Sequence, residues 1–258
     1  MSLKSLETAV GVLATFIQSD ATRSVTEIVE ETSLKKSHVS KILKTFREAG
    51  LLEQDPVTMR YAVGMGLFVL GSRFAARQAM AREALPIMRQ LVDDTSHSAT
   101  LSILYETSIM HLMAVEGPLY IDGRWRVGTL RPIHATAAGK VLLANMQPPA
   151  REDLLARATL KAFTPLTITD PAALSAQLMD IGKTGFALTR GESAPGLSAI
   201  SVPIFAENSK VVSALSIIMP DQLFDEEKIA AVRERMFSAA RSLSLKLGAP
   251  TYPFGGMS

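Results

Sequence analysis

Basic and hydroxyl side chains are concentrated in one short segment near the start of the chain, and their types suit contact with nucleic acid. Lysines and an arginine recur from Lys35 to Arg47, with no acidic residue before Glu48. In DNA-binding proteins lysines meet phosphate oxygens, while Ser, His and Lys side chains reach base edges in the major groove. The candidate contact residues are Lys35, Lys36, Ser37, His38, Ser40, Lys41 and Lys44.

A helix-turn-helix would present this basic segment on the surface of a small domain. A first helix is indicated by apolar residues that share one face, Leu6, Val10, Leu13 and Ile17. Ser24 and Glu27 have capping-box spacing, which predicts the start of a second helix. The basic segment itself carries a buried helical stripe at Val39, Ile42, Leu43 and Phe46. Gly50 can end that third helix, and two short strands around Pro56 follow.

These elements predict a winged helix-turn-helix over residues 1–63, with Arg60 of the wing as a further candidate for DNA contact. The charge of this domain is uneven rather than large. Residues 1–63 hold eight Lys/Arg and eight Asp/Glu, so their net charge is zero. A lysine-rich helix on its own is most often a solvated face. With a capped helix before it and a hairpin after it, the concentrated positive face indicates a DNA-binding domain instead.

Other residues come close to catalytic motifs without completing them. Gly191, Ser193 and Pro195 resemble a nucleophile elbow, but the elbow needs a final glycine and a later histidine, and no histidine follows His134. Residues 134–141 lack the first glycine and the Ser/Thr of a phosphate loop. The chain has no cysteine, and its four histidines lack metal-ligand spacing. We therefore expect no enzyme activity, metal or cofactor. The alternatives are a small-molecule-binding enzyme with an accessory helical domain and a protein–protein module, for which a lysine-rich face is poorly suited.

The rest of the chain predicts an α+β domain. An apolar content of 47% and a charged content of 20% are ordinary for a globular protein. No run reaches the roughly 18 apolar residues of a membrane helix, and no signal peptide is visible, so a cytoplasmic protein without membrane contact is expected. A linker helix is predicted at 64–80, a domain with a central, mostly antiparallel sheet and outer helices at 81–249, and a flexible tail at 250–258.

Four groups of residues give the chain a resemblance to the IclR (isocitrate lyase regulator) family of bacterial transcription factors. The resemblance extends over nearly the whole length. The third and fourth groups are the more specific ones, the first is weak alone, and the order and spacing of all four argue against a chance match. The matching segments are 5–10, then 50–55 with 60–64, then His134-Ala-Thr-Ala-Ala-Gly-Lys-Val-Leu-Leu-Ala144, and finally 185–187, Gly191-Glu192 and 196–204.

The resemblance implies a GAF-like second domain that binds a small effector, commonly a carboxylate or an aromatic acid. It also implies a homodimer or tetramer that binds a partly palindromic DNA operator. To change DNA affinity, the effector must favour one placement of the DNA-binding domains, which we expect it to do through the helix at 64–80. By position, the effector pocket is expected to be lined by Met113, Ala137, Ala138, Thr189, Ala199, Ser216 and Ile218. Ser216 and Ile218, two apart on a strand, point the same way.

Some of these positions depart from the family pattern. Members that bind small polar acids tend to have an acidic or thiol side chain near Thr189 and Ala199, and a hydroxyl near Ile218. This sequence therefore predicts a larger or less polar effector. In the wing, Met59 occupies a place where the family often has glycine, which predicts a wider turn.

Overall fold

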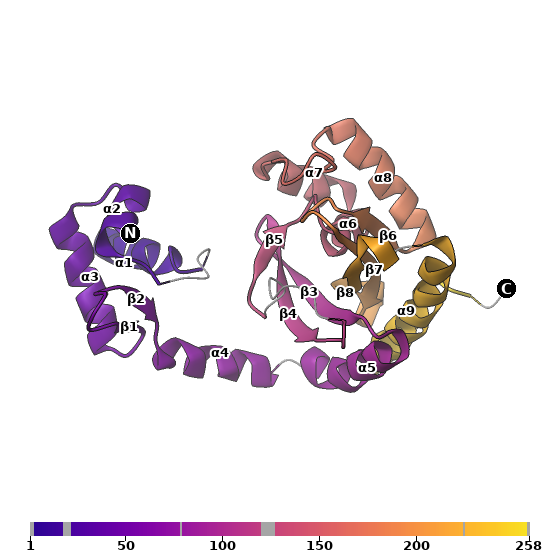
Figure 1. Ribbon diagram of the computed structural model, residues 1–258, viewed down its shortest axis with the longest axis horizontal. Coiled ribbons are helices and arrows are strands. Elements are labelled where there is room, and N and C mark those ends of the chain that lie inside the picture. The colour runs from indigo at the N-terminus through magenta and orange to yellow at the C-terminus, as the bar shows by residue number, and fades with distance from the viewer. Residues whose placement is uncertain (1–2, 18–21, 78, 120–126, 224, 257–258) are drawn as a thin grey trace. The chain divides into compact units, whose positions relative to one another are not determined.

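The computed structural model describes residues 3–17, 22–77, 79–119, 127–223 and 225–256. The chain divides into two compact units, 1–78 and 79–258, whose elements are labelled in Figure 1. The segment predicted as a linker helix contains one helix that clusters with the first unit and the beginning of a helix that belongs to the second. Among the described residues, no helix is long and apolar enough to cross a membrane. Residues 120–126, which include the single tryptophan of the sequence, Trp125, lie outside the described residues.

In the described part of the first unit, a three-helix bundle and a two-stranded antiparallel hairpin, as the sequence predicts, are followed by a fourth helix. Its elements are α1 (Lys4–Ala14), α2 (Val25–Thr32), α3 (Lys36–Glu48), β1 (Leu52–Gln54), β2 (Tyr61–Val63) and α4 (Met65–Arg77). The core consists of Val12, Phe16, Ile28, Val39, Ile42, Leu43, Leu52 and Tyr61. Burial of the α3 stripe fixes which side of that helix faces outward.

The apolar face expected on α1 is not the one that packs in this core. Val12 is fully buried, and of the four residues predicted to face the core only Leu13 packs partly against it. Leu6, Val10 and Ile17 are each more than half exposed. An α-helix with apolar residues on two sides can bury only one of them in so small a unit. The other side of α1 therefore remains an exposed apolar surface.

The described residues of the second unit form a six-stranded antiparallel sheet with helices on both faces, which confirms the predicted α+β, GAF-like architecture (Figure 1). The strands are β3 (Ser98–Tyr105), β4 (Ser108–Val115), β5 (Leu130–Pro132), β6 (Ala187–Arg190), β7 (Leu197–Phe205) and β8 (Val211–Pro220), in the order β5-β4-β3-β8-β7-β6. The helices are α5 (Ala79–Thr95), α6 (Ala137–Ala144), α7 (Pro148–Arg157), α8 (Pro171–Thr184) and α9 (Glu226–Lys246). The short strand β5 was not predicted.

Two hydrophobic cores lie on opposite faces of this sheet, because side chains alternate along each strand. On β8, Leu215 and Ile217 point into the core formed with α5 and α9. Ala214 points into the core formed with α6 and α8. Small and polar residues are interspersed among the apolar ones on the α6 side, which leaves room for a pocket there.

The C-terminal residues differ from the predicted flexible tail. Tyr252 and Phe254 pack against the α5–α9 core, and the Tyr252 hydroxyl donates to the Pro203 carbonyl oxygen at 3.1 Å. The Phe254 ring lies against Gly185, whose φ of 77° ends α8 and where an added Cβ would be 2.1 Å from the ring. Proline, glycine and a short length suggested a loose end, but the two aromatic side chains provide enough apolar area to order it.

Candidate functional site

The solvent-facing side of α3 carries the basic residues that are predicted to contact DNA. Lys35 immediately precedes the helix. The side chains of Lys35, Lys36, Ser37, His38, Lys41 and Lys44 are exposed, and that of Ser40 is half-buried. Lys44 lies 3.7 Å from Glu48, but such an exposed pair is worth at most about 1 kcal/mol and leaves the lysine available to a stronger partner. The structure thus brings the predicted α3 residues together on one accessible surface.

The turn before α3 is formed by well-defined caps on α2. The Ser24 hydroxyl accepts a hydrogen bond from the Glu27 backbone N–H at 3.2 Å, and the Ser24 N–H donates to Glu27 Oε2 at 2.8 Å. This is the capping box predicted from the sequence. At the other end Ser33 adopts φ 56°, a left-handed conformation that ends α2 and lets the chain turn into α3.

Arg60 connects the hairpin to α2. Its Nη2 donates to Glu27 Oε2 at 2.8 Å, and its Nε donates to Thr22 Oγ1 at 2.9 Å. The backbone hydrogen bond from Ser24 and the Arg60 side chain both lower the pKa of Glu27. Arg60 therefore has a structural role within the unit, and its contact with DNA stays a prediction.

The wing turn is organised by one carboxylate. Asp55 Oδ1 accepts hydrogen bonds from the backbone N–H groups of Val57 at 2.9 Å and Thr58 at 2.6 Å. Met59 has φ 58°, in the left-handed region that glycine adopts most easily. Met59 therefore adopts the backbone conformation that favours a glycine at this position, and the wider turn stays a prediction.

A small pocket lies in the second unit where the N-terminus of α6 meets the sheet. The volume open to a water-sized sphere is about 20 Å³, close to the volume that one water requires. It is lined by Thr100, Ile109, His111, Thr136, Ala137, Ala138, Thr189, Ser193, Ala199, Ser216 and Ile218. The structure therefore gathers all but one of the seven residues predicted to line an effector pocket.

Met113 is the exception, and a β-bulge explains it. Simple alternation along β4 would place Met113 on the same face as Ile109 and His111. The pairing register shifts between Leu101 and Ser102, because His111 opposes Ser102 while Met113 opposes Leu101. The bulge turns Met113 to the α5–α9 core, away from the pocket. The prediction of Met113 as a lining residue is wrong for this reason.

Hydroxyl and imidazole groups on the sheet form the floor of the pocket. Thr100 on β3 lies directly opposite Ser216 on β8, and Ser216 lies opposite Ser201 on β7. The Ser201 and Ser216 hydroxyls are 2.9 Å apart. His111 Nδ1 is 2.9 Å from the Ser102 hydroxyl. Thr100 and His111 were missed from sequence as site residues, although Thr100 and Ser102 alternate with Leu101 and Ile103 as polar residues on a strand face.

His111 is held neutral by its surroundings. Burial lowers its pKa from 6.5 to about 4, and the nearby positive charge of Arg131 adds to this effect. A neutral imidazole can donate through one nitrogen and accept through the other. The pocket floor is therefore uncharged near neutral pH.

Replacing His111 with glutamine should flatten the acid side of the stability profile. The unfolded chain takes up a proton on His111 near pH 6.5 and the folded chain only near pH 4. Protonation of His111 therefore does not lower the free energy of unfolding above pH 6.5. As the pH drops to 4, it lowers the free energy of unfolding by roughly 3 kcal/mol. Urea unfolding of both proteins across this range should show that loss in the parent only. An identical pH dependence in the two proteins would contradict a buried, neutral His111.

The N-terminus of α6 forms the wall of the pocket that faces the sheet. The Thr136 hydroxyl accepts a hydrogen bond from the Gly139 N–H at 3.1 Å and donates to the Pro132 carbonyl oxygen at 3.0 Å. An added Cβ on Gly139 would be 1.9 Å from the Ile133 carbonyl oxygen, so only glycine permits this approach. The amide groups of Ala137 and Ala138 are in the first helical turn, where backbone N–H groups have no partner within the helix and favour an anion.

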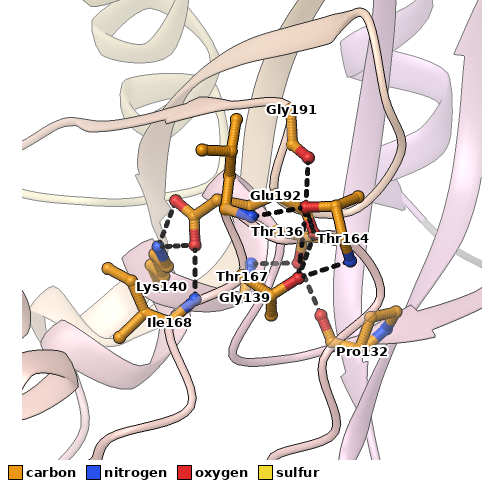
Figure 2. Close-up of polar contacts among 10 residues, drawn as sticks. Pro132, Thr136, Gly139, Lys140, Thr164, Thr167, Ile168, Gly191 and Glu192 are labelled. Atoms are coloured by element: carbon orange, nitrogen blue, oxygen red, sulfur yellow. Dashed lines mark hydrogen bonds and ion pairs between the residues drawn. The ribbon is translucent and has the colours of Figure 1, made fainter.

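A buried ion pair holds the adjoining loop against α6 (Figure 2). Lys140 is 0% exposed, and its Nζ lies 2.6 Å from both Glu192 oxygens. Burial lowers the pKa of Lys140, and Glu192 opposes that shift. The Thr164 and Thr167 hydroxyls donate to the carbonyl oxygens of Gly191 and Glu192, each at 2.7 Å (Figure 2). Lys140 is therefore a structural residue rather than a phosphate ligand.

The same loop carries Ser193, the serine of the incomplete nucleophile elbow. Ser193 lines the pocket, and its carbonyl oxygen accepts a hydrogen bond from Arg131 Nη2 at 3.2 Å. His134 is buried, with Nε2 3.0 Å from the Lys161 carbonyl oxygen. No group of three or more potential metal ligands was found within the described ranges.

Comparison with known proteins covers both units. The family model described as "IclR helix-turn-helix domain" matches residues 5–56, and the model described as "Bacterial transcriptional regulator IclR C-terminal" matches residues 73–245. The HTH-type transcriptional regulator BhcR of Paracoccus denitrificans is 31% identical over 242 residues, which span 94% of this chain and 86% of that protein.

Solved structures agree with the sequence comparison. The IclR protein of Thermotoga maritima aligns over 96% of this chain and 100% of its own, with a TM-score of 0.72 and 28% identity. An IclR homologue of Microbacterium hydrocarbonoxydans, solved in complex with 4-hydroxybenzoate, aligns over 94% of this chain and 98% of its own, with a TM-score of 0.79 and 28% identity. The chain belongs to the IclR family of bacterial transcriptional regulators, whose relatives are named as regulators and not as enzymes.

Proposed function

We propose that this regulator binds a partly palindromic DNA operator as a homodimer or tetramer, and that a small organic acid in the second unit changes its affinity for DNA. The observation that carries the DNA-binding part is the accessible α3 surface, where lysines and short hydrogen-bonding side chains gather although the domain has no net charge. Lysines there supply affinity through phosphates, and Ser37, His38 and Ser40 are the candidates for base readout.

An exposed apolar surface in the first unit supports self-association. Several large apolar residues of α1 and α4, with Leu3 just before α1, are 45% or more exposed: Leu3, Leu6, Val10, Met65, Phe68, Val69, Leu70 and Phe74. A groove of about 300 Å³ lined by Val10, Leu13, Ala14, Phe16, Ile17, Val63 and Leu67 runs along the same helices. Apolar surface on this scale marks interaction sites. A second copy is the occupant that a two-fold palindromic operator requires.

The pocket supports a carboxylate effector. Its α6 side offers first-turn amides to an anion, and its remaining walls are apolar or carry neutral hydroxyls. The relative crystallised with 4-hydroxybenzoate makes an aromatic acid a reasonable class for this chain as well. Because the pocket volume is about 20 Å³, such an acid requires lining side chains to move. Movement of the lining side chains can couple binding of the acid to a conformational change in the rest of the protein.

An effector can alter DNA affinity only by favouring one arrangement of the DNA-binding units over another. The connection between the units runs through α4 and α5. A shift at the α6 end of the pocket reaches α5 through the sheet, since α6 and α5 pack on opposite faces of β3 and β4. We propose this route for the switch.

Selection from a randomised DNA pool tests the proposed function. The full-length protein should enrich an inverted repeat whose half-site centres are roughly one helical turn apart, or a multiple of it. Replacing Ser37 or Ser40 with alanine should change the enriched sequence without abolishing enrichment. Failure to enrich any sequence would exclude specific DNA binding, and enrichment of a single half-site would exclude the symmetric dimer.

A further inference from the structure

The floor of the pocket contains one polar atom for which the fold supplies no partner. Thr100 is 1% exposed and lines the pocket, and its Oγ1 has no hydrogen-bond partner among the described residues. A buried hydroxyl without a partner is destabilising by about 1–3 kcal/mol, and such groups are uncommon in folded proteins. At this position it points to a ligand group that completes the hydrogen bond.

The Ser216 hydroxyl, next to Thr100, determines whether the ligand group must donate or accept a hydrogen bond. Ser201 donates its one hydroxyl hydrogen to the Leu215 carbonyl oxygen at 3.2 Å. Ser216, 2.9 Å from Ser201, is then the donor in their shared hydrogen bond, and its lone pairs remain as acceptors. Thr100 lies directly opposite Ser216 across β3 and β8, so their Cβ atoms are about 5 Å apart.

These two side chains are complementary to a ligand hydroxyl. A hydroxyl can accept from Thr100 and donate to Ser216 in one position. A carboxylate only accepts, and it would face the Ser216 lone pairs. An ammonium group would lose its hydration with no carboxylate among the described lining residues to replace it. His111, held neutral by burial, adds no charge to the floor.

From this arrangement we infer that Thr100 and Ser216 form a subsite for a neutral hydroxyl, and that the effector is a hydroxylated monocarboxylate. Its carboxylate faces the first turn of α6 and its hydroxyl faces the sheet. This inference rests on the proposed effector pocket and narrows the class of acid that the pocket selects.

Matched pairs of acids test the subsite in the full-length protein. Titration calorimetry with benzoate and the ortho, meta and para isomers of hydroxybenzoate, and with propanoate and lactate, measures what the hydroxyl adds. At least one hydroxylated acid should bind about tenfold more tightly than its parent, the effect of one good hydrogen bond. Thr100→Val should remove that preference and leave the affinity for the parent acid unchanged. Thr100→Ser should retain it.

Stability measurements separate a binding role from a structural one. Because Thr100 Oγ1 has no partner in the described fold, Thr100→Val should melt at the same or a higher temperature than the parent. Ser213→Ala is the matched control, since Ser213 is also fully buried, and its Oγ likewise has no partner in the described part of the chain. It lies opposite Ile204 on the α5–α9 side of the sheet, so this change should not affect any acid.

The outcomes distinguish the subsite from the proposed function. If hydroxylated and parent acids bind equally, or if Thr100→Val keeps the preference, the hydroxyl subsite is wrong while the carboxylate pocket stands. If none of the acids binds the parent protein, the proposed effector class and the subsite both fail. A lower melting temperature in Thr100→Val with unchanged acid preference would assign Thr100 to the fold alone.

Discussion

Replacing Lys140 with methionine should lower the free energy of unfolding by about 3–5 kcal/mol, the usual effect of removing one partner from a buried ion pair. Glu192 would remain as a buried charge, with the Ile168 N–H at 3.5 Å as a weak remaining donor. Thr164 and Thr167 hold the loop backbone around Glu192, so the carboxylate cannot move into solvent without breaking those hydrogen bonds. Urea or thermal unfolding of the full-length protein measures the change.

Two further variants make this result specific. Adding Glu192→Gln to Lys140→Met removes the stranded charge and should recover most of the loss. Lys161→Met changes an exposed lysine in the same unit and should stay within about 0.5 kcal/mol of the parent. If Lys140→Met is as stable as Lys161→Met, the ion pair does not hold the loop that carries Ser193 into the pocket wall.

Replacing Lys41 and Lys44 together with alanine should weaken DNA binding by about a hundredfold at moderate salt, on all sequences alike. Each lysine is exposed on α3 and is expected to neutralise one phosphate per subunit. Loss of two phosphate contacts should reduce the slope of log affinity against log salt by about two per subunit. Fluorescence anisotropy with a labelled operator at several salt concentrations gives both quantities.

A lysine of the second unit provides the control. Lys183, exposed on α8 of the second unit, carries the same charge, and Lys183→Ala should change neither affinity nor slope. An unchanged salt slope in the Lys41/Lys44 double variant would exclude phosphate contacts by these residues. A changed sequence preference would instead assign them to base readout.

The helix-turn-helix could be predicted from the sequence because its signals are local. The Ser24–Glu27 capping box and the α3 stripe each depend on residues within a few positions, and both are found as predicted. Exposure of the lysines then follows from the burial of the opposite side of the same helix. Arg60 was harder, because its partners Glu27 and Thr22 are distant in sequence and no local pattern connects them.

The pocket shows where sequence patterns stop being informative. Alternation places Ser216 and Ile218 on one face correctly, but the same rule fails for Met113, because a bulge depends on pairing with β3. The Lys140–Glu192 pair joins residues 52 positions apart. Thr100 could not be recognised as a ligand group from sequence, since its importance lies in the lack of a partner among the described residues.

Control of DNA binding by the pocket is measured most directly by the affinity of the full-length protein for its selected operator, with and without a saturating hydroxylated monocarboxylate. We expect the acid to change the dissociation constant for the operator by about fivefold or more, the range of ordinary allosteric coupling. The same acid should change the DNA affinity of Thr100→Val only at about tenfold higher acid concentrations, because this variant lacks the contact with the acid's hydroxyl. An operator affinity that no acid alters, although the acid binds the second unit, would contradict the claim that this pocket controls DNA binding.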